Sequence, residues 1–277
     1  MIFYSEVITS RNNPTVKWAA SLSDKKGRNE SGAFIAEGEK LTFEALSAGL
    51  KVTHIFVLES KKSAIFARLN EYNTRDEFKD CAVIVLSEGA FEKISTEKSP
   101  QGVIAAIKYL DFFRELDIIY KEDFIFNNSE RLIILCSLRD PGNLGAVIRS
   151  SAAFGVDHII LTSDSADLYN PKTVRSAMGS LFHLKATVVK DLAASISELK
   201  SAGRRVFAAE LSENALPLSD VRMSSMDVVI IGNEGHGIPK EISSLCDSSV
   251  YIPISKNTES LNASVAASIF IWEQSKA

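Results

Sequence analysis

The feature that most constrains this chain is a short apolar run that leads directly into a loop rich in glycine. Val228–Ile231 has the composition of a buried strand, and G-N-E-G-H-G-I-P, residues 232–239, follows it at once. Three glycines within six residues leave the backbone open to close contact, whereas a plain tight turn, the alternative, requires only one. Open α/β sheets bind ligands at the carboxyl ends of their strands. We therefore expect a parallel sheet with a ligand loop after this strand.

A second strand with a polar loop precedes it in the chain. L-I-I-L-C-S-L after Arg131 predicts a buried strand, R-D-P-G-N-L-G-A-V-I-R leads into a helix, and His158–Thr162 predicts the next strand. A strand–helix–strand unit of this kind is a parallel crossover. The loop matches neither G-x-G-x-x-G nor G-x-x-x-x-G-K-[ST], so the two common nucleotide fingerprints are absent. Arg149 lies among small residues. It either contacts a ligand or forms an ordinary ion pair at the surface.

The third unusual stretch is Tyr251–Glu273, a polar loop that feeds an apolar helix. One interpretation is a helix capped by Ser260 and buried on the sheet. The other is a helix whose small residues let a ligand or another chain press close. The apolar residues that recur at helical spacing, and that we expect on the buried face, are Leu261, Val265, Ile269 and Trp272.

The N-terminal part predicts a separate, smaller domain. Strands are predicted in the segment G-A-F-I-A-E-G and at Val52–Leu58, Ala82–Leu86 and Gly102–Lys108, and helices alternate with them. This alternation favours a small α/β domain with a largely parallel sheet. The acidic and aromatic stretch Tyr109–Glu130 then reads as a connection between domains. The expected organisation is a small α/β domain over 1–108, a linker over 109–130 and a second α/β domain over 131–277.

Basic residues gather near the N-terminus although the chain as a whole is acidic. The net charge is −4 and the pI is about 5.7, so any contact with nucleic acid requires a local patch. The candidates are Arg11, Lys17, Lys25, Lys26 and Arg28, with Lys172 and Arg175 further along. They form either a solvated surface or a phosphate-contacting patch, with Trp18 available to stack on a base.

Several classes of protein do not fit the composition. The three cysteines are far apart and the four histidines lack metal-ligand spacing, so we expect neither a disulfide scaffold nor a metal site. The first ten residues do not read as a signal peptide, and no apolar run reaches the length of a membrane span. We therefore expect a protein of the cytoplasm.

Three segments together resemble the motifs of the SpoU/TrmH family. They are N-L-G-A-V-I-R (143–149), I-G-N-E-G-H-G-I-P (231–239) and I-P-I-S-K-N-T-E-S-L-N-A-S-V-A (252–266), and they occur in the family's order. Members of this family are S-adenosylmethionine-dependent RNA ribose 2′-O-methyltransferases of the SPOUT superfamily. The openings V-I-T-S-R-N-N-P-T-V-K and G-A-F-I-A-E-G-E-K also resemble the ribosomal-protein-like RNA-binding domain that many members carry in front.

The resemblance implies a fold and a set of site residues. The fold is a SPOUT-type parallel sheet with a deep trefoil knot, in a homodimer. The implied catalytic residues are Asn143, Arg149, Glu234 and Asn262. The implied S-adenosylmethionine-binding residues are Gly232, Asn233, Glu234, Gly235, Ile252, Ser260, Leu261, Asn262 and Ser264.

The implied activity is methylation of a ribose 2′-hydroxyl, with ribosomal RNA as the substrate and transfer RNA as the alternative. Arginine hardly deprotonates in proteins, so our hypothesis is that Arg149 holds a phosphate and stabilises charge on the 2′-oxygen. A non-catalytic RNA-binding module with the same fold is a rival interpretation. A dinucleotide-dependent oxidoreductase fits less well, because its fingerprint glycines are missing.

Overall fold

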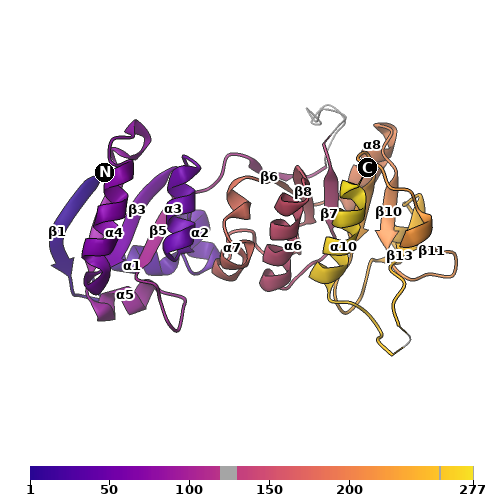
Figure 1. The fold of residues 1–277 in the computed structure, drawn as a ribbon. Coiled ribbons are helices and arrows are strands. Elements are labelled where there is room, and N and C mark those ends of the chain that lie inside the picture. The colour runs from indigo at the N-terminus through magenta and orange to yellow at the C-terminus, as the bar shows by residue number, and fades with distance from the viewer. Residues whose placement is uncertain (119–129, 256, 277) are drawn as a thin grey trace. The chain divides into compact units, whose positions relative to one another are not determined.

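The computed structural model describes residues 1–118, 130–255 and 257–276, which form two compact units (Figure 1). Unit 1 comprises Met1–Leu110 and Asp167–Phe182, and unit 2 comprises Asp111–Ala166 and His183–Ala277. Residues 119–129 of the expected linker lie outside the described part of the chain.

Unit 1 contains a five-stranded sheet in the order β1-β4-β3-β5-β2. Its strands are β1 (Ile2–Ile8), β2 (Ala33–Glu37), β3 (Val52–Leu58), β4 (Ala82–Leu86) and β5 (Val103–Lys108). Its α-helices are α1 (Pro14–Ser21), α2 (Lys25–Ser31), α3 (Glu39–Ser47), α4 (Lys62–Leu69), α5 (Glu88–Ile94) and α7 (Pro171–Ala177). Short 3₁₀ turns are η1 (Glu59–Lys61), η2 (Asn70–Tyr72), η3 (Asp76–Phe78) and η4 (Ser180–Phe182).

The sheet of unit 1 is mixed, with two parallel and two antiparallel strand pairs, so the expectation of a largely parallel sheet holds only in part. β3 runs parallel to β4, and β4 runs parallel to β1, whereas β5 is antiparallel to both of its neighbours, β3 and β2. β1 did not emerge from the sequence, because its residues are mostly exposed at the edge of the sheet and show no buried alternation.

The core of unit 1 forms where α1 and α5 cover this sheet. Val16 of α1, Leu22 at the C-cap of α1 and Phe91 of α5 pack in one cluster with Phe56 of β3. Trp18 is tied down beside this cluster: its indole Nε1 donates to Ser31 Oγ at 3.1 Å, and its ring lies 4.7 Å from that of His54. Trp18 is therefore a half-buried packing residue, and stacking of its ring on a base stays a prediction.

Arg28 also departs from the sequence-based expectation. Its side chain is only 2% exposed, so it cannot reach a phosphate at the surface. Nη2 donates to Asp167 Oδ2 at 2.5 Å, and Nη1 donates to the carbonyl oxygens of Leu22 and Ser23 at 3.1 and 2.7 Å. The guanidinium thus joins the end of α1 to the segment 167–182 within unit 1. Arg28 is therefore a structural residue, and the expectation that it contacts RNA is wrong.

Unit 2 is built on an eight-stranded sheet in the order β11-β13-β10-β12-β7-β8-β9-β6, in which every pair is parallel. Its strands are β6 (Phe113–Leu116), β7 (Leu132–Leu135), β8 (His158–Thr162), β9 (Lys185–Val189), β10 (Val206–Ala209), β11 (Leu216–Pro217), β12 (Val228–Ile231) and β13 (Ser248–Tyr251). Its helices are α6 (Pro141–Ala153), α8 (Leu192–Ser201), η5 (Leu218–Asp220), α9 (Lys240–Ser243) and α10 (Ala263–Ser275). The expected α/β fold with a parallel sheet is confirmed.

The central strands of this sheet are covered on both faces, which explains their unbroken apolar sequences. Side chains of β7, β12 and β10 pack with Ile196 and Leu199 of α8. α10 packs against α6, as Figure 1 also shows, with Ser150 Oγ and Ser268 Oγ 2.7 Å apart and the rings of Phe154 and Trp272 in contact at 5.2 Å. Among the described residues, no helix is both long and apolar enough to cross a bilayer.

We predict that Arg28→Ala lowers the free energy of unfolding of the full chain by about 2–4 kcal/mol, because it leaves Asp167 and two carbonyl groups without their donor. Lys26→Ala is the matched control on the same helix, since the ion pair of Lys26 with Glu30 is 3.9 Å long and highly exposed. That control should change stability by less than about 0.5 kcal/mol. Urea unfolding measures both, and equal effects would show that Arg28 is not a structural anchor.

Candidate active site

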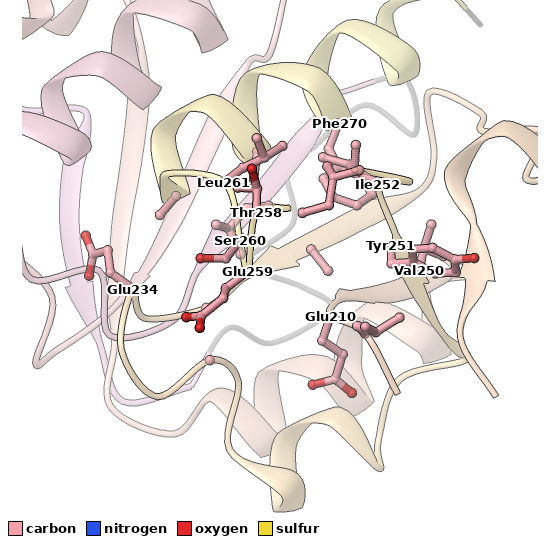
Figure 2. Close-up of a pocket in the computed structure, with 18 of the residues that line it drawn as sticks. Glu210, Glu234, Val250, Tyr251, Ile252, Thr258, Glu259, Ser260, Leu261 and Phe270 are labelled. Carbon is pink, nitrogen blue, oxygen red and sulfur yellow. The ribbon is translucent and has the colours of Figure 1, made fainter. Parts of the chain in front are cut away.

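A pocket of about 810 Å³ lies at the carboxyl ends of three neighbouring strands of unit 2 (Figure 2). The chain leaving β10 supplies Ala209–Leu211, the loop after β12 supplies Ile231–Gly235 and Gly237, and the chain after β13 supplies Val250–Ser255 and Thr258–Leu261. Ala263, Ala266 and Phe270 of α10 close one side. Because parallel strands end at one edge of a sheet, segments distant in sequence meet here.

The loop after β12 is held by a close contact between two stretches of backbone. A Cβ atom placed on Gly232 would lie 2.5 Å from the backbone carbon of Gly237 and 2.7 Å from the nitrogen of Ile238. Asn233 and Gly237 exchange two backbone hydrogen bonds of 3.0 Å. The side chain of Asn233 donates to the carbonyl of Ser137 at 2.8 Å and accepts from the N–H of Gly235 at 2.9 Å. Asn233 therefore fastens the loop to the end of β7.

Three polar side chains join the three sequence motifs at this edge. Asn143 Nδ2 donates to Glu234 Oε1 at 2.8 Å, and Asn262 Nδ2 donates to Asn143 Oδ1 at 3.0 Å. Each asparagine is itself positioned by a helix start: Asp140 caps α6 by accepting from the N–H of Asn143 at 2.8 Å, and Asn262 caps α10. The result is a continuous amide–carboxylate chain across the motifs.

The cap of α10 corrects one expectation. Asn262 Oδ1 accepts from the N–H of Ser264 at 2.9 Å and from that of Val265 at 3.4 Å, so Asn262, and not Ser260, is the N-cap. Ser260 instead lines the pocket. The loop is two residues longer than the sequence suggested because the stronger cap lies further along.

The expected buried face of α10 is also wrong. Val265 is 47% exposed and Trp272 is 49% exposed. The buried positions of this helix are Ala263, Ala267, Phe270, Ile271 and Gln274. Apolar residues occupy most of the circumference of α10, so periodicity alone could not distinguish the packed face from the exposed one.

Arg149 lies on α6, the helix that begins beside Asn143, and its side chain is exposed. Within the part of the chain that the structure describes, its guanidinium makes no hydrogen bond or ion pair, so the alternative of an ordinary surface ion pair is not observed there. Arg149 does not line the pocket itself. An exposed cation on the helix that carries the motif asparagine is suited to an anionic group of a ligand.

The expected cofactor residues divide into two groups. Gly232, Asn233, Glu234, Gly235, Ile252, Ser260 and Leu261 line the pocket, whereas Asn262 and Ser264 lie at the start of α10 outside the lining. The sequence analysis missed Glu210, Leu211, Thr258 and Glu259 of the lining. Strand order was needed to find Glu210, because only the pairing of β10 with β12 and β13 brings it to this edge.

The charges around the pocket have one sign. Its described lining contains Glu210, Glu234 and Glu259 and no lysine, arginine or histidine. A lining of this kind favours a ligand that carries positive charge. No group of three or more histidine, cysteine or acidic side chains among the described residues is arranged to hold a metal ion.

The remaining basic candidates lie in unit 1. Arg11, Lys17, Lys25 and Lys26 are exposed on or beside α1 and α2. Lys172 is exposed on α7. On the same helix, Arg175 forms an ion pair with Glu97 and donates to Thr96 Oγ1 at 3.3 Å, so part of its donor capacity is used within the unit.

We predict that Gly232→Ala forces the loop open, because the added methyl group meets backbone and not a flexible side chain. The expected cost is about 1–3 kcal/mol, with faster amide hydrogen exchange at residues 233–237. Gly235→Ala is the matched control, since its Cβ would lie 3.7 Å from Asn233 Oδ1. Exchange rates that are the same in both variants would contradict the close backbone contact.

Family models match both parts of the chain. The model of the SpoU rRNA Methylase family matches residues 130–272, and that of the MRM3-like substrate binding domain matches residues 13–105.

Curated proteins and solved structures of similar length also match. The chain is 31% identical to the 23S rRNA (guanosine(2553)-2′-O)-methyltransferase RlmP of Bacillus subtilis, with 96% of this chain and 97% of that protein covered. It is 28% identical to the 23S rRNA (uridine(2479)-2′-O)-methyltransferase of Streptomyces viridochromogenes, covering 96% and 90%. The crystal structure of an AdoMet-bound rRNA methyltransferase from Sinorhizobium meliloti superimposes with a TM-score of 0.79 at 28% identity, covering 97% and 96%.

Proposed function

This chain belongs to the SpoU rRNA methylase family, and from that membership we infer that it methylates a ribose 2′-hydroxyl of RNA with S-adenosylmethionine as the methyl donor. The substrate is ribosomal RNA: similar proteins that align over almost the whole chain are named 23S rRNA 2′-O-methyltransferases. The observation that carries the function is a series of two hydrogen bonds, from Asn143 to Glu234 and from Asn262 to Asn143, which joins all three motifs beside the pocket.

The pocket fits this donor on its own chemistry. When bound, the donor supplies a methyl group on a positively charged sulfur. Apolar side chains of Ile252, Leu261 and Phe270 provide a surface for a flat purine, and the acidic lining suits the positive charge. The close backbone contact at Gly232 leaves peptide groups at the pocket wall, where they can hydrogen-bond a ligand without side chains in the way.

On the acceptor side of the reaction, we assign the main role to Arg149. In methyl transfer the ribose oxygen bonds to the methyl carbon as the carbon–sulfur bond breaks. The hydroxyl proton is released to water, and negative charge develops on the oxygen as the proton leaves. Arg149 remains protonated, so its guanidinium acts by holding an adjacent phosphate and stabilising that oxygen. Glu234 and Asn262 orient Asn143 through its amide, which fixes a polar group at the pocket edge.

The direct test is incubation of the protein with S-adenosylmethionine and ribosomal or transfer RNA, followed by mapping of the methylated ribose. Methylation of ribosomal RNA at one nucleotide is the expected result. Binding of RNA and donor without methyl transfer would instead support a non-catalytic module. Methylation of transfer RNA alone would assign the other substrate.

We predict that Arg149→Lys lowers kcat by about 100-fold or more while leaving the Kd for S-adenosylmethionine unchanged, because lysine keeps the charge but loses the planar fork. Arg139→Lys serves as the control, since Arg139 is an exposed arginine that pairs with Asp164 at 3.1 Å. Single-turnover methylation and calorimetry give the two quantities. Nearly full activity of Arg149→Lys would contradict this role.

The small domain supports RNA binding, and residues 13–105 match a substrate-binding family model. We predict that the pair Lys17→Glu and Lys25→Glu weakens binding of ribosomal RNA at least about tenfold and lowers its salt dependence. Lys51→Glu with Lys79→Glu makes the same charge change at other exposed positions of unit 1. Equal losses from both pairs would show a general charge effect and no patch at α1 and α2.

The exposed apolar side of α10 supports a homodimer. Val265 and Trp272 are about half exposed on a helix of 13 residues, an arrangement that favours burial against a second copy. We predict that the wild-type protein sediments as a dimer and Val265→Asp as a monomer. Leu216→Asp, at a position 45% exposed on β11, should remain dimeric. If the wild-type protein sedimented as a monomer, the proposal of a homodimer would be wrong.

The remaining features implied by the family are also proposals. A deep trefoil knot, in which the segment after β13 passes through an earlier loop, is supported by family membership, and tracing the chain in an experimental electron-density map would test it. The domain boundaries 1–108 and 131–277 are supported by the two family models, although β6 (Phe113–Leu116) pairs within the sheet of unit 2 and Asp167–Phe182 belongs to unit 1. Limited proteolysis within 109–130 would test them. A ribosomal RNA substrate and three free cysteines support a cytoplasmic location, which cell fractionation would test.

A further inference from the structure

Glu210 forms a wall of the pocket that the family motifs do not include. It follows β10 directly, and Figure 2 shows it on a different side of the pocket from Glu234, with Glu259 between them in the view. Its N–H donates to the carbonyl of Val250 at 3.1 Å, so its backbone is fixed against β13. Glu210 is half-buried, whereas Glu234 and Glu259 are exposed.

The carboxylate of Glu210 is oriented but not neutralised. Ser249 Oγ donates to Oε1 at 2.9 Å, which fixes the rotation of the group. Among the described residues Glu210 has no ion pair, and its second oxygen accepts no hydrogen bond. A half-buried carboxylate with acceptor positions to spare is suited to a ligand that donates hydrogen bonds.

Two parts of S-adenosylmethionine donate hydrogen bonds: the ribose diol and the ammonium group of the methionyl arm. The methionyl arm also carries a carboxylate, and the described lining offers it no lysine or arginine. A zwitterionic arm is therefore better placed toward solvent, beside the exposed Glu234 and Glu259, than against the half-buried Glu210. The adenosine part of the donor is then the part that contacts the side of the pocket formed by Glu210.

The diol also matches the geometry of a carboxylate at a strand end. Two neighbouring hydroxyl groups can each donate to one carboxylate oxygen, and acidic residues near strand ends recognise ribose in this way in other α/β folds. Resting on the proposed function, we propose that Glu210 binds the ribose diol of the methyl donor, with Ser249 as the residue that positions it.

The test uses calorimetry with three ligands that report on different parts of the donor. 5′-Methylthioadenosine keeps the adenosine and lacks the methionyl arm, its 3′-deoxy analogue lacks one hydroxyl of the diol, and S-adenosylhomocysteine has both parts. In the wild-type protein the 3′-deoxy analogue should bind about tenfold more weakly than 5′-methylthioadenosine, which is the loss of one charge-assisted hydrogen bond. In Glu210→Gln this ratio should fall to about threefold or less.

Two further variants and one control sharpen the result. Ser249→Ala should reduce the same ratio partially, because the carboxylate then rotates freely. Glu213→Gln changes a nearby exposed glutamate outside the lining and should keep the full tenfold ratio. Thermal unfolding of each variant shows that it is folded.

The outcomes separate the alternatives. An unchanged ratio in Glu210→Gln would overturn the proposal. A selective loss of S-adenosylhomocysteine with 5′-methylthioadenosine unaffected would overturn it in favour of the ammonium group. If the wild-type protein bound none of the three ligands and no S-adenosylmethionine, the proposed function itself would fail, and this result is distinct from the other two.

Discussion

The pocket depends on two stretches of backbone lying in van der Waals contact where β12 ends. Only a residue without Cβ fits at 232, because the carbonyl carbon of Gly237 lies within 2.5 Å of the position that a Cβ would occupy. This contact folds the loop back on itself, and Asn233 then ties it to Ser137 at the end of the neighbouring strand β7. The closed loop also places Glu234, whose carboxylate accepts the hydrogen bond from Asn143.

The parallel sheet turns this local contact into a binding site. β10, β12 and β13 end at one edge, so their following segments surround one volume although they are far apart in sequence. Each of the three segments makes a different main contribution to the pocket. The loop after β12 supplies backbone, the chain after β13 supplies apolar surface, and Glu210 after β10 supplies a fixed charge.

Much of this arrangement could be predicted from the sequence, and the failures have physical causes. β3, β4, β8 and β12 were found at their observed bounds because they are buried and bounded by polar residues or glycine. β1 was missed, since an exposed edge strand has no apolar pattern to detect. The packed face of α10 was assigned wrongly because that helix is apolar nearly all round, and Arg28 was misread because charge in a sequence does not reveal burial. Glu210 could not be found without the order of the strands.

The position of α10 in the chain has a consequence for protein synthesis. The helix follows every strand of unit 2, yet it supplies Ala263, Ala266 and Phe270 to the pocket and, through Asn262, the last link of the polar chain. A nascent polypeptide that has emerged from the ribosome only as far as β13 contains every described strand of the sheet but only part of the pocket lining. The order of translation thus delays the complete binding site until the last helix has emerged.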